Sequence, residues 1–173
     1  MQMSIKKKRR LSIAAALLII AMIGWRLWPR PIDKVISTRP ESVNSIACSA
    51  TVSGVEDGDL FMDTYSIQSE NLTDADIEAL MEILNSTKYR PDLRNLLPWD
   101  ITSVDSGGTN DGKSANLALV WGKSEAEHCY MMFHSVSVVA VDVGSGGYLI
   151  YHPTERAVLD KLVDYIQEHG IAK

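Results

Sequence analysis

The sequence predicts an α+β fold: a mainly antiparallel sheet with both helices on one face, preceded by one N-terminal transmembrane helix. Three observations predict it. An apolar run follows a basic cluster near the N-terminus, several short stretches alternate between apolar and polar residues, and two stretches space their apolar residues by three and four. The element order expected after the first helix is β-β-α-β-β-β-β-β-α.

The apolar run Leu11–Trp25 contains no charged residue and follows the basic cluster Lys6–Arg10. This pattern is typical of an export signal. Bulky or charged residues occupy the positions just after the run, where a cleavage site needs small ones, so we expect an uncleaved signal anchor. The run is shorter than the roughly 20 residues of a usual membrane span. We therefore extend the transmembrane segment to residues 11–28, with Arg26 reaching the interface.

The tight basic cluster predicts that residues 1–10 form a cytoplasmic tail and that the rest of this single-pass chain lies outside the cytoplasm. Residues 29–42 contain several prolines and no apolar period, which favours a linker. Residues 43–173 are then the extracytoplasmic α+β domain, held at the cell membrane by the N-terminal helix.

Charge narrows the range of partners. The first thirty residues hold seven of the 17 basic side chains and none of the 22 acidic ones, so the remainder carries a net charge of −12. Such a surface repels phosphate, which excludes nucleic acid as a partner. We expect a neutral or cationic partner, such as an envelope protein or peptide.

The first half of the domain predicts a hairpin and a helix. Residues 45–53 alternate with period two and pair with residues 60–68 across the turn Glu56–Asp59. Thr73 is expected to cap a helix that ends near residues 86–87. Its apolar stripe consists of Ile77, Leu80, Met81 and Leu84. Residues 87–99, which contain two prolines, are expected to be irregular.

The second half predicts a run of strands and a closing helix. The expected strands are a short one at Ile101–Asp105, one along Leu117–Trp121, one along Cys129–Phe133, one at Val136–Val143 and one at Tyr148–Tyr151. The segment His152–Thr154 is expected to cap the helix, and Gly170 to end it. The apolar stripe of this helix consists of Leu159, Leu162, Val163 and Ile166.

Cys48 and Cys129 both fall in the part of the chain expected outside the cytoplasm. An even number of cysteines in an oxidising compartment favours one disulfide between them. Two separate buried thiols are the alternative, because a free cysteine packs as a small apolar residue.

The catalytic and ligand-binding motifs in the sequence are weak. Residues 107–114 match the phosphate-binding loop pattern, but the residues after them alternate as a strand, whereas the motif needs a helix, so no nucleotide is expected. His128, Cys129 and His134 do not make a metal site, because Cys129 and His134 point to opposite faces of one strand. No cofactor and no metal are expected.

The chain resembles a known group of proteins in its layout. The segments that show the resemblance are a short N-terminal anchor, a hairpin beginning SIACSATVSG, a helix opening at Leu72–Asp74, the stretch Tyr148–Tyr151 and a closing helix. In these it resembles the small membrane-anchored extracytoplasmic α+β domains of uncharacterised Gram-positive bacterial proteins. The resemblance implies a bacterial source and no catalytic or binding residues.

We therefore expect a membrane-tethered, non-enzymatic binding module of unknown activity. The expected binding surface is the sheet face that the helices leave uncovered, carrying Tyr65, Tyr130, Tyr148 or Tyr151, or an exposed strand edge. An envelope-associated hydrolase with a cleft near His134, Ser135 and His152 is the alternative. A sensor or accessory subunit of a membrane complex is a third hypothesis.

Overall fold

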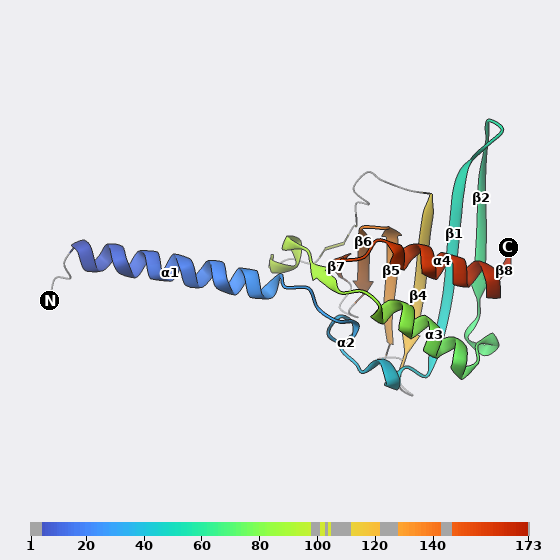
Figure 1. Cartoon of the computed structure of the whole chain (residues 1–173), viewed down its shortest axis with the longest axis horizontal. Helices are drawn as coiled ribbons and strands as arrows, with labels where there is room; N and C mark the ends of the chain where they lie inside the picture. The colour runs from blue at the N-terminus through green and yellow to red at the C-terminus, as the bar shows by residue number, and fades with distance from the viewer. Residues whose placement is uncertain are drawn as a thin grey trace.

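The computed structural model describes residues 5–97, 101, 102, 104, 112–121, 128–142 and 147–172, with side chains from residue 12 onward. A long helix, α1 (Ile5–Arg26), projects from a body built on one sheet (Figure 1). The strands of the body are β1 (Ser45–Glu56), β2 (Asp59–Ile67), β3 (Tyr89–Pro91), β4 (Lys113–Val120), β5 (His128–Ser135), β6 (Val138–Asp142), β7 (Tyr148–Pro153) and β8 (Ile171–Ala172). Its helices are α2 (Ile32–Val35), α3 (Asp74–Asn85) and α4 (Ala157–His169), with short 3₁₀ turns η1 (Pro40–Ser42), η2 (Ser69–Asn71) and η3 (Leu93–Leu96).

The strands form one antiparallel sheet in the order β3-β7-β6-β5-β4-β1-β2-β8. The predicted α+β class and the antiparallel sheet are confirmed, but the predicted strand order is wrong. The short strand expected at residues 101–105 is only a bridge from Ile101 to Tyr148, and Ser103 and Asp105 lie outside the described residues. Two strands were also missed, β3 and the terminal β8.

Strand β3 was missed because it contains Pro91, which cannot donate a backbone hydrogen bond. Proline is tolerated on an edge strand, where one side of the ladder is unpaired. In the sheet, β3 is the edge beside β7, with Tyr89 opposite Pro153 and Pro91 opposite Tyr151. The proline therefore marks an edge rather than an irregular segment.

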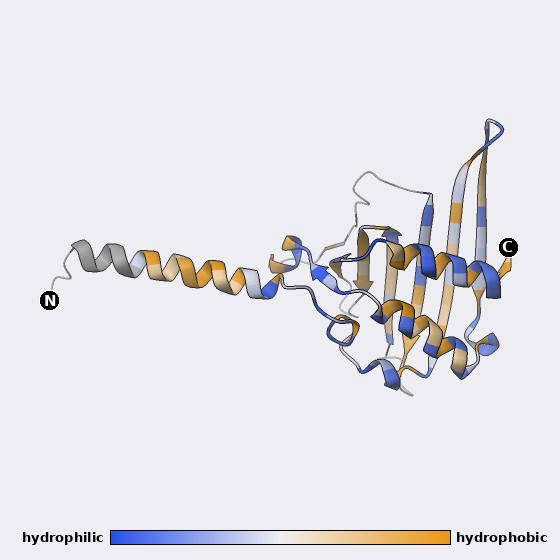
Figure 2. Ribbon diagram, viewed as in Figure 1, coloured by the Kyte–Doolittle hydropathy of each residue, from blue (hydrophilic) through white to orange (hydrophobic). Residues whose placement is uncertain are grey.

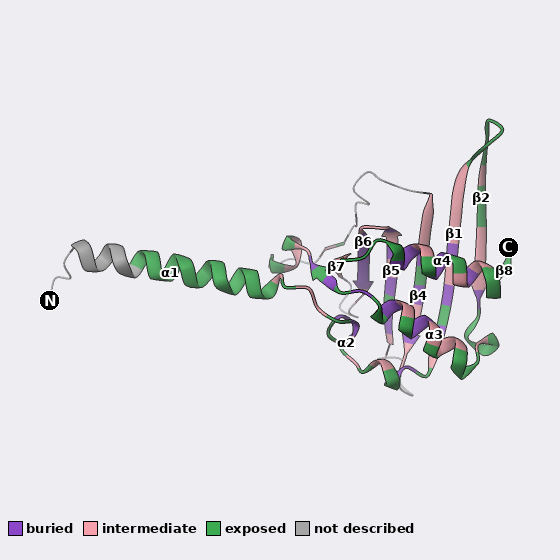
Figure 3. Ribbon diagram, in the orientation of Figure 1, coloured by how far each residue is buried: buried purple, intermediate pink, exposed green. Residues whose placement is uncertain are grey.

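Helices α3 and α4 cover the same face of the sheet (Figure 1). The apolar stripes predicted from their spacing face the strands, and Leu80, Leu84, Leu159 and Leu162 are fully buried (Figure 3). Thr73 caps α3 as predicted, in a reciprocal capping box with Asp76. The helix α4 begins only at Ala157, because His152 and Pro153, two of the three residues expected to cap it, still belong to strand β7.

The segment 29–42, expected to be a linker, is packed against the body. It contains α2, in which Ile32, Val35 and the following Ile36 are between 0 and 3 % exposed and belong to the main core. Just before α2, Arg30 exchanges two backbone hydrogen bonds with Tyr89 of β3, at 2.9 and 2.8 Å. The body therefore begins directly after α1.

Between Ile13 and Trp25 the helix α1 carries mainly apolar residues, and the basic Arg26 ends it (Figure 2). Its large apolar side chains from Ile13 to Ile23 are 40–64 % exposed, and Trp25 is 78 % exposed (Figure 3). Among the residues that the structure describes, no helix has both the length and the apolarity needed to cross a bilayer, so the transmembrane helix predicted at residues 11–28 is not found there.

The β1–β2 hairpin, which is predicted correctly, depends on two left-handed residues at its tip. Asp57 has a φ of 53° and Gly58 a φ of 93°, as a two-residue turn matching the twist of the strands requires. Another left-handed residue, Gly112, has a φ of 74° and lies against Ser53 of β1. Its carbonyl accepts a hydrogen bond of 2.6 Å from the Ser53 amide, so two backbones meet there.

Replacing Gly112 by alanine is expected to destabilise the body more than replacing Gly58. A β-carbon on Gly112 would stand 2.0 Å from the Ser53 carbonyl oxygen, whereas one on Gly58 meets nothing within 4 Å. Gly58→Ala then costs about 1–2 kcal/mol for its backbone conformation alone, and Gly112→Ala about 3 kcal/mol or more. Urea unfolding of the two variants measures the difference, and equal losses would show that the close approach is unimportant.

Candidate functional site

The sheet face opposite α3 and α4 carries a row of side chains that crosses five strands. The register places Ala47 of β1 opposite Ala118, which in turn pairs with Tyr130 on β5. Tyr130 pairs with Asp142, and Asp142 with Tyr148 on β7. Directly opposed residues of an antiparallel sheet project from the same face. The row therefore runs from two small alanines to two tyrosines that flank a carboxylate.

A second row beside it has small and polar residues at one end. Ser66 of β2 pairs with Ser49, Ser49 with Asn116, and Asn116 with Met132 of β5. Small side chains leave space above the strands, while Met132 and the tyrosines rise around it. The sequence in this way makes a hollow in the middle of the open face.

The hollow is a groove of about 660 Å³, within the range of small-molecule and peptide sites. The side chains that give it its chemistry are those of Ser49, Ser66, Gln68, Ser69, Glu70, Asn116, Ala118, Tyr130, Met132, Asp142 and Tyr148. Two of the described lining residues are acidic and none is basic. The groove thus offers hydroxyl and amide groups, two aromatic rings and negative charge.

The tyrosines of the groove differ in exposure. Tyr130 is 45 % exposed, and its ring packs edge-on against His128 with the centroids 5.0 Å apart. Tyr148 is half-buried, and its backbone amide donates a 2.9 Å hydrogen bond to the Ile101 carbonyl. Ile101 joins a small second apolar cluster around Ile150, which borders the groove at the β7 side.

The other two tyrosines expected on the binding surface lie on the opposite side of the sheet. Tyr151 pairs with Val139 of the main core and is 4 % exposed, and Tyr65 packs against the same core opposite Ala50. Each strand alternates its side chains between two faces, so Tyr148 and Tyr151, three apart, must point in opposite directions. Only Tyr130 and Tyr148 face the groove.

The expected disulfide is absent, and both cysteines are free and buried. Strand β4 lies between β1, which carries Cys48, and β5, which carries Cys129. Two strand spacings separate the Cα atoms by more than about 9 Å, beyond the reach of a disulfide. Burial raises the pKa of Cys48 to about 11 and that of Cys129 to about 12, so both thiols are protonated at neutral pH.

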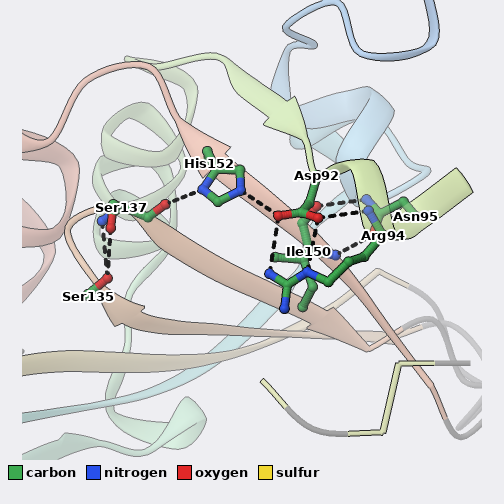
Figure 4. A network of polar contacts seen from close by, with 7 residues as sticks. All are labelled: Asp92, Arg94, Asn95, Ser135, Ser137, Ile150 and His152. Atoms are coloured by element: carbon green, nitrogen blue, oxygen red, sulfur yellow. Dashed lines mark hydrogen bonds and ion pairs between the residues drawn. The ribbon is translucent and has the colours of Figure 1, made fainter. Parts of the chain in front are cut away.

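A polar network connects η3 and its capping residue Asp92 with β7 and with the turn between β5 and β6 (Figure 4). His152 of β7 bonds to the Asp92 carboxylate through Nε2 at 2.8 Å and to the Ser137 carbonyl through Nδ1 at 2.7 Å. Arg94 donates to the same carboxylate from Nε and Nη2, at 3.0 and 3.1 Å. Carbonyl and carboxylate oxygens only accept, so His152 makes both bonds at once only when both ring nitrogens carry protons.

Ser135 and His152, two residues of the hydrolase hypothesis, are not hydrogen-bonded to each other in this network. Ser135 is fully buried and shares its hydroxyl with Ser137 at 3.1 Å, while both ring nitrogens of His152 are bonded to groups other than a hydroxyl. A serine nucleophile requires a base within hydrogen-bond reach of an accessible hydroxyl. The network instead fixes the chain after β3 to the sheet.

His134, the third residue of the hydrolase hypothesis, lies apart from this network. It alternates with Phe133 and so faces the open side of β5. Its Nε2 atom is buried and has no hydrogen-bond partner in the described part of the chain. Burial lowers the pKa of His134, which leaves the ring neutral at neutral pH.

The network residues Asp92, Arg94 and Asn95 were missed by sequence reasoning because they follow Pro91 in the segment expected to be irregular. One local signal was available. Asp92 caps η3 by accepting a 2.7 Å hydrogen bond from the Arg94 amide, a turn that aspartate often makes with the backbone two residues on. The pairing with His152, 60 residues later, has no local signal.

The Asp92 carboxylate is expected to make the free energy of unfolding depend on pH in the acidic range. Hydrogen bonds from Arg94 hold the pKa of Asp92 well below its ordinary value. Its stabilisation is therefore complete above the unfolded-state pKa of about 4 and lost as the pH falls below that. In urea unfolding, Asp92→Asn should be much less stable than the original chain at pH 6, and the gap should narrow towards pH 2.5. A gap that stays constant with pH would contradict this assignment.

Two further motifs are placed only in part. Residues 107–111 of the phosphate-loop match lie outside the described residues, and the end of the match, Lys113 and Ser114, begins strand β4. Within the described ranges, no three histidine, cysteine, aspartate or glutamate side chains lie close enough together to hold a metal ion.

No protein-family model, curated protein or solved structure matches the chain. The resemblance to membrane-anchored extracytoplasmic domains therefore stays a prediction. The chemistry of the groove, the network and the exposed helix is what bears on function.

Proposed function

We propose that this chain is a membrane-tethered binding module whose body lies outside the cytoplasm and whose open sheet face holds its partner. One observation carries the proposal. A groove of about 660 Å³ occupies the uncovered face, with Tyr130, Met132 and Tyr148 around small polar residues. A pocket with aromatic walls and a few placed polar groups is typical of a recognition site.

The proposed tether is α1. Its apolar side chains are exposed on every side and make no core with the body, so water is an unfavourable surrounding for them. Basic residues flank the apolar run, with five before it at Lys6–Arg10 and then Arg26 and Arg30. The tighter cluster precedes the run, which favours a cytoplasmic N-terminus. Tethering raises the local concentration of the body for partners at the same membrane.

The groove chemistry favours a neutral or basic peptide segment as the partner. Glu70 and Asp142 line it, no described lining residue is basic, and residues 31–173 carry a net charge of −12. The faces of Tyr130 and Tyr148 can take a cationic side chain, while Asn116 and the serines can bond to peptide groups. An acidic partner would be repelled.

The proposal is tested by filling the groove. Full-length chain in mild detergent is applied to arrays of acidic, neutral and basic octapeptides, alongside the variant Ala118→Trp. Ala118 is the small residue opposite Tyr130 on the open face, so an indole there occupies the groove. The matched control is Lys161→Trp, on the exposed side of α4.

Neutral and basic peptides are expected to be retained, with Ala118→Trp reducing retention at least about tenfold, a loss of about 1.4 kcal/mol. Lys161→Trp should retain them like the original chain. The proposal fails if no peptide is retained, if acidic peptides are preferred, or if the two tryptophan variants behave alike.

A further inference from the structure

A second apolar surface lies on η3 and the residue after it. Leu93, Leu96 and Leu97 are 64, 39 and 43 % exposed. Three leucines exposed within five residues of a short turn form a patch, whereas isolated exposed apolar residues are common. We name these residues, together with Trp28, the interfacial patch; Trp28 is 70 % exposed.

The polarity of η3 is inverted relative to an ordinary surface turn. Its polar side chains bond inward: Arg94 to Asp92 at 3.0 Å, and Asn95 to the Ile150 backbone in both directions, at 2.7 and 2.9 Å (Figure 4). The leucines between and after them are left facing outward. The exposed apolar groups of the turn are therefore leucines. Its polar side chains, including that of Arg94, which is 39 % exposed, have hydrogen-bond partners within the protein, and this lowers the cost of placing them beside an apolar phase.

The two parts of the interfacial patch are joined at one point of the fold. Arg30, two residues after Trp28, exchanges backbone hydrogen bonds with Tyr89, and η3 begins four residues after Tyr89. In Figure 1, η3 lies at the end of the body from which α1 projects. The patch therefore sits where the body meets the apolar helix.

The charge around this junction is opposite to that of the body. Arg26, Arg30 and Arg90 form no ion pair with any side chain in the described part of the chain, although residues 31–173 carry a net charge of −12. Basic residues beside apolar and indole groups suit a headgroup region, where anionic lipids attract cations and tryptophan lies at the boundary. A protein partner would need no such arrangement at the base of a membrane helix.

We propose that the interfacial patch inserts into the lipid headgroup region and seats the body on the membrane beside α1. This inference rests on the proposed tether. Because η3 is fixed to β7 and α1 leads directly into the Arg30–Tyr89 bridge, the body then has two attachments to the same surface. Two attachments hold the groove in one orientation relative to the membrane, whereas one would let the body pivot.

The test uses nitroxide labels on full-length chain in vesicles of phosphatidylethanolamine with a minority of phosphatidylglycerol. Leu93→Cys and Leu97→Cys report on the patch. Leu60→Cys is the matched control, an exposed leucine at 78 % on the hairpin tip, and Leu18→Cys reports on α1. Unsubstituted chain treated in parallel corrects for the buried native thiols.

For each label, the accessibility of the nitroxide to oxygen is compared with its accessibility to a water-soluble nickel chelate. The ratio of oxygen to chelate accessibility is expected to be several times higher at positions 93 and 97 than at position 60. This ratio corresponds to depths of about 5–10 Å at the headgroup boundary. Position 18 is expected to be deepest. If position 18 is deep while 93 and 97 behave like 60, the seating is overturned and the tether stands. If position 18 also behaves like 60, both proposals are overturned.

Discussion

Replacing Ile32 by alanine is expected to lower the free energy of unfolding by about 2–4 kcal/mol. Ile32 is completely buried and packs in the main core, together with Val35 and Ile36. The substitution removes apolar contacts and leaves a cavity that the surrounding strands and helices can close only in part. The loss is measured by urea unfolding of full-length chain in detergent, followed by near-ultraviolet circular dichroism of the body.

The matched control is Ile171→Ala, the same substitution at a residue that is 69 % exposed on the terminal strand. It is expected to change stability by less than about 0.5 kcal/mol. If Ile32→Ala costs as little as Ile171→Ala, then residues 29–42 are a linker, as their prolines predict from sequence, and the body begins further along the chain.

The proposed tether predicts that two arginines placed in α1 release the chain from the membrane. Leu18 and Ile19 are near the centre of the apolar run and are 62 and 56 % exposed. An arginine at the centre of a membrane helix costs about 2.5–3.5 kcal/mol on insertion scales, so the double variant loses about 5–7 kcal/mol. This exceeds a thousandfold change in the insertion equilibrium.

The control is Leu60→Arg with Met62→Arg, two apolar residues on the β1–β2 hairpin that are 78 and 68 % exposed. After an alkaline carbonate wash of membranes, the original chain and this control should stay in the pellet, and the α1 variant should not. Equal retention of all three would show that α1 is not the tether.

The sequence predicts elements correctly where their signals are local. The helix α3 follows from the stripe Ile77, Leu80, Met81 and Leu84 and from the cap at Thr73, all within one segment. The hairpin follows from the alternation of residues 45–53, the turn Glu56–Asp59 and a second, less regular strand at residues 60–68. These features depend on spacing that a single stretch of sequence contains.

The segment 29–42 was misjudged although it carries a helical spacing. Ile32, Val35 and Ile36 recur at i, i+3 and i+4, and all three are buried. The stripe is a single turn long, and the prolines on either side of it favour an extended linker. Only packing against the rest of the body decides between the two, and packing is not a local property.

The sequence predicts the sheet face on which the groove lies, but not the residues that line it. Alternation places Tyr130 and Met132 on the same side of β5. Which residues stand opposite them depends on the pairing of β4 with both β1 and β5, and this register arises from the whole sheet. The same strand order separates the cysteines, so the disulfide hypothesis fails for the reason that makes the groove unpredictable.

The groove is tested most directly by methyl resonances of the methionines in full-length chain held in lipid nanodiscs. Met132 and Met131 both border the groove, but alternation along β5 directs only the Met132 side chain into it. The Met131 side chain faces the helices and is fully buried, and Met62 is exposed on the hairpin. On addition of a lysine-containing octapeptide, the Met132 resonance is expected to shift in a saturable way while those of Met131 and Met62 stay in place. A shift at Met62 with Met132 unchanged, or no shift at any methionine, would contradict a binding site on the open face.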